Sequence, residues 1–150
     1  MNTIEPVPIG HVRNGVTEWV DVTWEDITSD VVLDLPWSEA LDGLEEFSHV
    51  WVIAWLDRLP EEERGARAKV HPEGRQDVPA VGLFATRSPR RPNPIAITVV
   101  PLIERRDNVL TVKGLDLLDG TPVLDVKPYL SRGDRIDRPR EPQWLQRLRR

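Results

Sequence analysis

The chain has 150 residues, 39% of them hydrophobic, and a net charge of −5 at pH 7; this predicts one folded domain with its own core. The sequence contains no cysteine, which excludes a disulfide framework and thiolate metal sites. No apolar run approaches the about 20 residues of a membrane span, and the first residues lack the pattern of a secretory signal, so we expect a cytoplasmic protein without membrane contact.

Acidic and basic residues are unevenly distributed along the chain. Residues 1–63 contain 15 acidic side chains against two basic ones, whereas residues 64–150 contain 18 basic against 10 acidic. Such a chain can present a basic surface to a polyanion while staying acidic overall. The alternative is that the opposite charges pair across the fold.

Short runs rich in β-branched residues recur along the chain between Pro, Gly, Asp and Asn, and each run predicts a strand. The predicted strands are Val7–Val12, Val16–Val22, Val31–Leu35, Val50–Leu56, Val81–Thr86, Ile95–Ile103, Val109–Leu115 and Val123–Val126. In the sixth run, Ile95, Ile97 and Val99 alternate with smaller residues, which is typical of a strand covered on one face. Residues 105–108 predict a hairpin turn. Strands of this length and spacing favour a mainly β fold, a barrel or a sandwich.

Few helices are expected, and all of them are short. Ser38 can cap a turn over Glu39–Leu44, and Pro60–Glu63 has the proline and acidic residues of a helix start. The segment Pro142–Arg150 places its apolar residues on one helical face and predicts a C-terminal helix. Residues 66–80 are polar and irregular, which indicates a functional or mobile surface loop.

The sequence has no nucleotide-binding fingerprint. Neither a G-x-G-x-x-G following a strand nor a G-x-x-x-x-G-K-[ST] is present, which argues against Rossmann and P-loop folds. The three histidines, His11, His49 and His71, lie far apart in the sequence. We therefore expect no metal site, and we interpret His49, between Phe47 and Trp51, as a hydrogen-bonded, partly buried structural residue.

In the segment Arg87–Pro94, three arginines and three prolines directly precede a predicted strand. Because proline fixes φ and lacks an N–H donor, this segment cannot be helical, and we expect a stiff cationic arm. Its arginines can fork onto a carboxylate or phosphate and can stack on a base. As an alternative, Pro89 and Pro92 have the P-x-x-P spacing of a polyproline ligand, although such ligands usually lie in disordered tails.

A second dense segment, Gly114–Tyr129, is rich in aspartate. The run D-G-T-P that begins at Asp119 predicts a turn, since Asp can bond its own backbone and the glycine accepts a positive φ. Asp116, Asp119 and Asp125 are therefore expected near strand ends, where carboxylates can accept hydrogen bonds from an amine or a ribose. The alternative is that Asp119 only caps its turn and that Asp125 faces water or pairs with Lys127.

Four motifs occur in order: "PIGHVRN", "GLEEFSHVWV", "RSPRRPNPIAIT" and "GLDLLDGTPVLDVKPY". Together they resemble the TsaA-like family, which includes the TrmO-type tRNA methyltransferases, from about Ile9 to Tyr129. The resemblance is to the single-domain branch of this family. It implies a small β-barrel domain over residues 1–150, with a core over about residues 7–131 and an arginine-rich tail over residues 132–150. It also implies a homodimer.

The resemblance further implies an S-adenosylmethionine-dependent methyltransferase that methylates N6 of threonylcarbamoyladenosine at position 37 of tRNA. The residues that it implies at the cofactor are Asp57, Arg58, Arg87, Ile97, Asp116, Leu117, Leu118 and Asp119. Of these, Arg87 would form a charge-assisted fork with the cofactor carboxylate. The residues that we assign to tRNA are Arg90, Arg91 and Asn93. Asp119 and Tyr129 are the candidates for the catalytic base.

The chain departs from the family pattern at several positions. Ala96 and Thr98 stand where glycine and serine are common in the family, and residues 20–25 replace a Pro-Arg-Gln element of the larger enzymes. Two alternatives therefore stay open: a methyltransferase with a small-molecule acceptor, and a non-catalytic barrel that binds a nucleotide or RNA. In each case we expect Arg87 and Asp119 to share one cleft.

Overall fold

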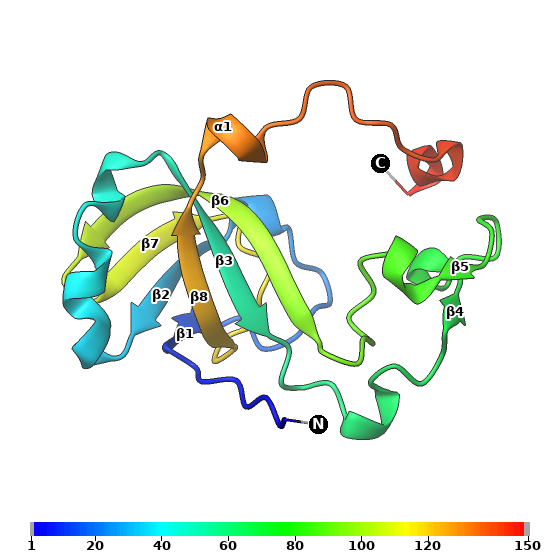
Figure 1. Cartoon of the computed structure of the whole chain (residues 1–150), viewed down its shortest axis with the longest axis horizontal. Helices are drawn as coiled ribbons and strands as arrows, with labels where there is room; N and C mark the ends of the chain where they lie inside the picture. Colours follow the sequence, from blue (N-terminus) through cyan, green and yellow to red (C-terminus); the bar gives the residue numbers. More distant parts are fainter. Residues whose placement is uncertain (1, 149–150) are drawn as a thin grey trace. The chain divides into compact units, whose positions relative to one another are not determined.

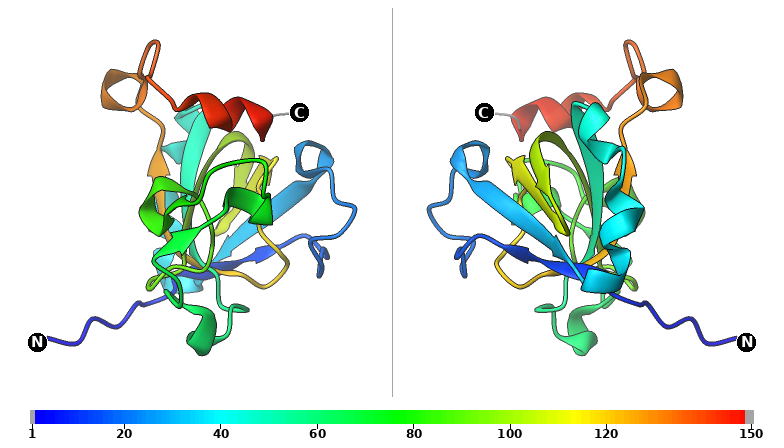
Figure 2. Two further views of the ribbon diagram at one scale, coloured as in Figure 1. Left: turned by 90° about the vertical axis from the view of Figure 1, so that its right-hand side faces the viewer. Right: turned by 90° about the vertical axis from the view of Figure 1, so that its left-hand side faces the viewer.

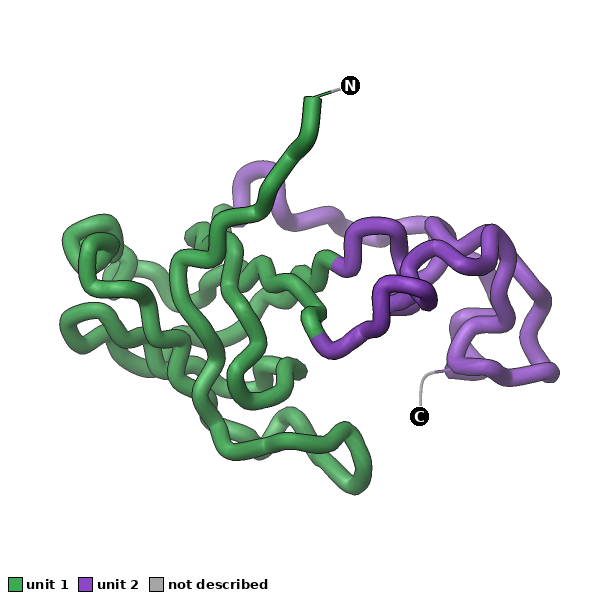
Figure 3. The backbone as a smooth tube through the Cα atoms, turned by 90° about the horizontal axis from the view of Figure 1, so that it is seen from below, with its two compact units in different colours: residues 1–57, 95–130 green, residues 58–94, 131–150 purple. Residues whose placement is uncertain are grey.

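The structure is a computed structural model, and it describes residues 2–148. The chain forms two compact units, drawn in two colours in Figure 3. We call Met1–Asp57 with Ile95–Leu130 the barrel unit, and Arg58–Pro94 with Ser131–Arg150 the insert unit. The boundaries predicted from the sequence, a core over about residues 7–131 and a separate tail, stay a prediction.

The barrel unit is a closed barrel in the order β1-β2-β7-β6-β3-β8, and its neighbouring strands are antiparallel (Figure 1). Its strands are β1 (Gly10–Arg13), β2 (Thr28–Leu33), β3 (His49–Trp55), β6 (Ile95–Arg106), β7 (Val109–Lys113) and β8 (Pro122–Pro128). This confirms the mainly β fold and the barrel. The predicted hairpin is also present, because Arg106 pairs with Val109 across a turn in which Asp107 has a φ of 51°.

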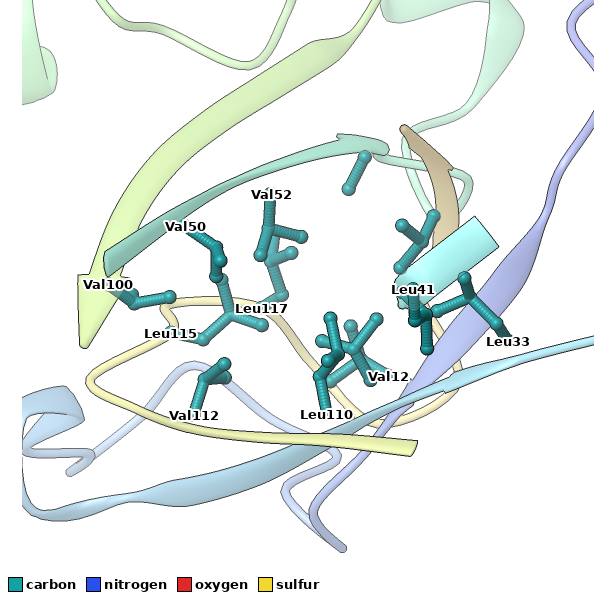
Figure 4. Close-up of a cluster of buried hydrophobic side chains, with 13 residues drawn as sticks. Val12, Leu33, Leu41, Val50, Val52, Val100, Leu110, Val112, Leu115 and Leu117 are labelled. Carbon is teal, nitrogen blue, oxygen red and sulfur yellow. The ribbon is translucent and has the colours of Figure 1, made fainter. Parts of the chain in front are cut away.

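Alternating side chains of these strands fill the barrel interior, as the two-residue period of a strand requires. The fully or almost fully buried core residues include Val12, Val31, Val50, Val52, Val100, Leu110, Val112, Leu115, Leu117 and Val123 (Figure 4). Ala96 packs against this cluster from β6. The interior is therefore a packed core of branched aliphatic side chains.

The helices are short, as expected (Figure 2). The 3₁₀ helices are η1 (Trp24–Asp26), η2 (Leu35–Leu41), η3 (Leu44–Glu46), η4 (Glu61–Glu63), η5 (Pro72–Gly74), η6 (Leu83–Ala85) and η7 (Gln143–Arg147). One short α-helix, α1, covers Ser131–Asp134, and the insert unit also holds a small sheet of β4 (Lys69–Val70) and β5 (Val81–Gly82). The predicted C-terminal helix is the 3₁₀ helix η7, and residues 149–150 lie outside the described residues.

Three of the predicted strands are wrong in whole or in part. The strand predicted at Val7–Val12 begins only at Gly10. Residues 16–22 form bends and turns, because Gly15 and Asp21 flank and interrupt this stretch with φ values of 73° and 58°. The predicted strand Val81–Thr86 pairs only at its first two residues and then turns into η6. In that turn the Thr86 hydroxyl donates to the Leu83 carbonyl at 2.7 Å, a local bond that replaces strand pairing.

Candidate functional site

The Asp119 turn is tied to the loop that follows β1. Oδ1 of Asp119 accepts hydrogen bonds from the backbone N–H groups of Asn14 and Gly15 at 2.8 and 3.0 Å. The backbone N–H of Asp119 in turn donates to the Val16 carbonyl at 2.7 Å. These bonds fix the entrance to β8 against the end of β1. They place one carboxylate oxygen of Asp119 in a structural role.

Asn14 holds the same junction together with its side chain. Its Nδ2 donates to Oγ of the buried Ser29 and to the Leu117 carbonyl, each at 2.9 Å, while its Oδ1 accepts from the Val16 N–H at 2.9 Å. No role for Asn14 was expected from the sequence, although an asparagine followed by glycine is a turn signal. The side chain connects three segments that are distant in the sequence.

The carboxylate of Asp116 lies on the surface beside β6. The Thr98 hydroxyl donates to Oδ1 of Asp116 at 2.8 Å, so the hydroxyl retained at this family position orients the acid. Leu117 belongs to the barrel core and is 1% exposed, and Leu118 is also buried, at 5% exposed. Both side chains are therefore buried, and only the backbone of these two residues is available to a ligand.

The end of β3 and the start of β8 meet at one end of the barrel. Trp55 pairs with Ile95, and Ala54 pairs with Val123, so Asp57 after β3 and Asp119 before β8 belong to the same end. This end therefore gathers cofactor candidates that come from distant parts of the chain.

Tyr129 lies at the opposite end of β8. Its backbone N–H donates to the His49 carbonyl at 3.0 Å. Its ring lies edge-on to the His49 ring, with 6.3 Å between the two ring centroids. The seven residues of β8 separate it from Asp119, a span of about 20 Å at ~3.3 Å per residue. Within one chain, the two candidate bases therefore cannot reach the same atom.

The cationic arm belongs to the insert unit and is irregular, as expected. Nη1 of Arg91 donates to the carbonyls of Thr86 and Ser88 at 2.8 and 3.1 Å, so this guanidinium braces the arm internally. Arg90 forms an exposed ion pair with Glu63 at 3.4 Å. Among the residues that the structure describes, the exposed side chain of Arg87 has no hydrogen-bond or ion-pair partner.

The arm lies close to Gly65 within the insert unit. Pro94 is fully buried, and a Cβ added to Gly65 would lie 2.9 Å from Cγ of Pro92. Gly65 also has a φ of 65° and donates its N–H to the Arg90 carbonyl at 3.0 Å. A side chain at this glycine is excluded by space and by backbone conformation. The prolines of the P-x-x-P spacing, Pro89 and Pro92, are both exposed, so the polyproline alternative stays open.

The charge asymmetry of the sequence coincides with the two units. The barrel unit carries 17 acidic and five basic side chains, whereas the insert unit carries 15 basic and eight acidic ones. The remaining cofactor candidates divide accordingly, because Asp57 and Ile97 lie in the barrel unit while Arg58 and Arg87 lie in the insert unit. Asn93 also lies in the insert unit and is exposed.

Between residues 2 and 148, no three His, Asp or Glu side chains come together as metal ligands. None of the described helices has the length and apolar character that crossing a bilayer requires.

The chain is similar to known proteins in sequence. Residues 21–135 match the family model described as tRNA-methyltransferase O N-terminal domain. A probable S-adenosyl-L-methionine-binding protein of Pyrococcus abyssi is 39% identical over 132 residues, which cover 85% of this chain and 68% of that protein. The tRNA (adenine(37)-N6)-methyltransferase of Mus musculus is 42% identical over 92 residues, 61% of this chain and 21% of the mouse protein.

The fold is similar to a solved structure as well. TrmO from P. aeruginosa superimposes with a TM-score of 0.74 at 32% identity, over 95% of this chain and 62% of the solved one. The chain therefore spans less than two thirds of that structure and about a fifth of the mouse protein.

Proposed function

The chain belongs to the tRNA-methyltransferase O family, and from this premise we propose that it methylates N6 of threonylcarbamoyladenosine at position 37 of tRNA, with S-adenosylmethionine as methyl donor. The observation that carries the proposal is the family-model match over residues 21–135, which includes the cationic arm and the aspartate turn. The relatives named above as S-adenosylmethionine-binding and tRNA-methylating proteins support the donor and the acceptor.

The donor set of the chain fits S-adenosylmethionine. When bound, this cofactor supplies a methyl group on a cationic sulfur, together with a carboxylate, an ammonium group and a ribose. The guanidinium of Arg87 has no partner among residues 2–148 and can fork onto the carboxylate. Asp116, oriented by Thr98, can accept hydrogen bonds from the ribose or the ammonium. The acidic barrel unit also favours a cationic ligand.

The chain's contribution to methyl transfer is chiefly alignment. Displacement at a methyl carbon requires the attacking nitrogen, the carbon and the leaving sulfur to be in line, and alignment alone supplies a large part of the acceleration. Arg87, Asp116 and the backbone of residues 115–118 would hold the donor, while Arg90, Arg91 and Asn93 would hold the RNA. Asp119 and Tyr129 stay the candidates for accepting the N6 proton.

We also propose that two chains associate through the outer face of β3 and β6. Six apolar side chains lie side by side there because their strands pair in register: Trp51, Ile53, Trp55, Ile95, Ile97 and Val99. The last three are 44%, 44% and 39% exposed. An apolar face of this kind marks an interface, and a two-fold axis brings the same face of both chains together. On the neighbouring strand β8, Lys127 and Asp125 form an ion pair, so the strand next to this apolar face carries no net charge from these two residues.

Binding of labelled S-adenosylmethionine tests the donor assignment. We expect saturable binding that Arg87→Ala weakens at least about tenfold, since a charge-assisted fork is lost. Arg67→Ala is the matched control and should bind normally, because Arg67 is also an exposed arginine of the insert unit whose side chain has no ion pair among the described residues. No saturable binding, or equal binding by both variants, would contradict the assignment.

Mass spectrometry of tRNA nucleosides tests the acceptor. Purified protein and donor should convert threonylcarbamoyladenosine in tRNA to its N6-methyl form. Donor binding without this conversion would favour a small-molecule acceptor. RNA binding without donor binding would favour the non-catalytic module.

A further inference from the structure

Phe84 is an exposed aromatic side chain next to the cationic arm. It lies in the middle of η6, and 77% of its surface is exposed, whereas the adjacent Leu83 is buried. A large ring left in solvent contributes nothing to the core of the insert unit. An exposed aromatic beside cationic side chains is instead the usual arrangement for stacking an unpaired base.

Arg91 holds the ring from one side. The guanidinium carbon lies 5.6 Å from the centroid of the Phe84 ring, within the range of a cation–π contact. The two hydrogen bonds of Arg91 to the Thr86 and Ser88 carbonyls fix the guanidinium in this place. Because most of the ring remains exposed, a further planar group can stack on it.

The backbone beneath Phe84 is restrained by local hydrogen bonds. Both the backbone N–H and the hydroxyl of Thr86 donate to the Leu83 carbonyl, at 3.1 and 2.7 Å. The same hydroxyl accepts from the Ser88 N–H at 3.1 Å. A ring presented on a restrained turn loses little conformational freedom when a ligand stacks on it.

The insert unit has the charge that an RNA ligand requires. It carries 15 basic side chains against eight acidic ones. Within the described part of this unit, several exposed arginines have no ion-pair or hydrogen-bond partner: Arg67, Arg132, Arg138 and Arg140. Such side chains can neutralise phosphates independently of base sequence.

We propose that Phe84 is a stacking platform for an unpaired base of the RNA substrate, held in place by Arg91, in a basic unit that binds the RNA backbone. The inference that the ligand is RNA rests on the proposed function. The chemical class of the ligand is a single-stranded loop with accessible base faces, because bases inside a duplex cannot reach an exposed ring. Phe84 would supply the stacking contact. The exposed arginines named above would supply the salt-dependent part of the affinity.

The probe is a fluorescently labelled tRNA anticodon stem–loop, with 2-aminopurine at one loop position in a second preparation. Phe84→Leu keeps the apolar bulk but removes the ring, and we expect it to weaken RNA binding about 5- to 150-fold. Phe84→Trp restores a ring and should bind within about twofold of the wild type. Ile136→Ala, which changes another exposed apolar residue of the insert unit, should have no effect.

Two readouts separate stacking from a general structural role. The 2-aminopurine fluorescence should be quenched on binding to the wild type and not to Phe84→Leu. The dependence of log K on log salt should keep its slope in Phe84→Leu, because no charge is removed, whereas Arg138→Ala should make it shallower. S-adenosylmethionine binding should be unchanged in all of these variants.

The possible results distinguish this proposal from the proposed function. Equal RNA binding by wild type and Phe84→Leu, or no RNA binding by either, overturns the stacking platform. Loss of S-adenosylmethionine binding in Phe84→Leu also overturns it, since the ring would then belong to the donor site. RNA binding that depends on Phe84 in a chain that does not bind the donor supports the platform and contradicts the methyltransferase.

Discussion

Asn14 and Asp119 are 105 residues apart in the sequence, yet the backbone N–H of Asn14 donates a 2.8 Å hydrogen bond to Oδ1 of Asp119. The neighbouring N–H of Gly15 donates to the same oxygen. This carboxylate therefore closes the junction between the loop after β1 and the entrance to β8. It is also a candidate for the catalytic base, so the structural and chemical roles of Asp119 have to be separated by experiment.

Substitution of Asp119 separates these roles. Asp119→Ala removes the acceptor of two backbone N–H groups and should lower the free energy of unfolding by about 2 kcal/mol. Asp119→Asn keeps a carbonyl oxygen at this position and should cost less than about 1 kcal/mol. Urea denaturation measures both values. Asp125→Ala is the control, because its partly exposed ion pair with Lys127 should contribute less than about 1 kcal/mol.

The activity of Asp119→Asn then decides its chemistry. A folded Asp119→Asn that binds the donor but does not methylate identifies the carboxylate as the base. A folded variant with unchanged activity assigns Asp119 to the junction alone and leaves Tyr129 as the candidate. Equal stability of Asp119→Ala and wild type would contradict the structural role.

Strands whose β-branched residues alternate were predictable from the sequence. The runs Val31–Leu35, Val50–Leu56 and Val109–Leu115 coincide with β2, β3 and β7 to within a few residues. Here the local preference and the barrel require the same conformation, so the pattern is sufficient. Residues 16–22 have a similar composition, but a strand also needs a partner ladder, and positive φ values at Gly15 and Asp21 turn the chain away from one.

The candidate site was predictable where it depends on turn chemistry. The aspartate-rich turn lies at a strand end, as expected, because Asp and Gly specify it locally. The role of Asn14 depends on contacts with Ser29 and Leu117, which no local pattern contains. The exposure of Phe84 was also not predictable, because a run of apolar residues does not show which member is left outside the core.

Arg105 is predicted to be a major determinant of barrel-unit stability. Its side chain is only 16% exposed, pairs with Asp42 at 2.9 Å, and donates to the carbonyls of Ser38 and Asp107. Arg105→Ala leaves these partners without a donor and should lower the free energy of unfolding by about 2–3 kcal/mol. The matched control is Arg106→Ala, because Arg106 is 76% exposed and pairs only at the surface with Glu104; its loss should cost less than about 1 kcal/mol. Similar costs for both variants would show that the Arg105 contacts are not stabilising.

The outer face of β3 and β6 is predicted to be the dimer interface. Ile97→Glu places a carboxylate opposite Ile53 at the centre of this face, and burying an unpaired charge in an apolar interface is costly. We expect a dimer for the wild type and a monomer for the variant by light scattering after size exclusion. Val20→Glu, at an exposed position in a loop of the same unit, should stay dimeric. A monomeric wild type, or a dimeric Ile97→Glu, would contradict this interface.

Asp30 is predicted to make part of the stability depend on pH. Its carboxylate accepts hydrogen bonds from Arg13 and Thr111, each at 2.8 Å, and the bond from Arg13 is the main reason that the pKa of Asp30 is lowered from its ordinary value. Because the pKa is lower in the folded than in the unfolded chain, the ionised group stabilises the fold above the unfolded pKa of about 4, and this contribution is lost as the pH falls through the folded pKa.

Urea denaturation between pH 7 and pH 2 tests this dependence. Asp30→Asn should be less stable than the wild type by about 1 kcal/mol at neutral pH. The difference should shrink as the pH falls below about 4, because the wild-type carboxyl then becomes protonated. Asp34→Asn, which changes an exposed carboxylate at the end of β2 with no capping hydrogen bond, should leave the pH dependence of the wild type unchanged. Parallel pH profiles for wild type and Asp30→Asn would show that the ion pair with Arg13 does not couple folding to protonation, whereas converging profiles assign this part of the acid sensitivity to a single carboxylate between β1 and β7.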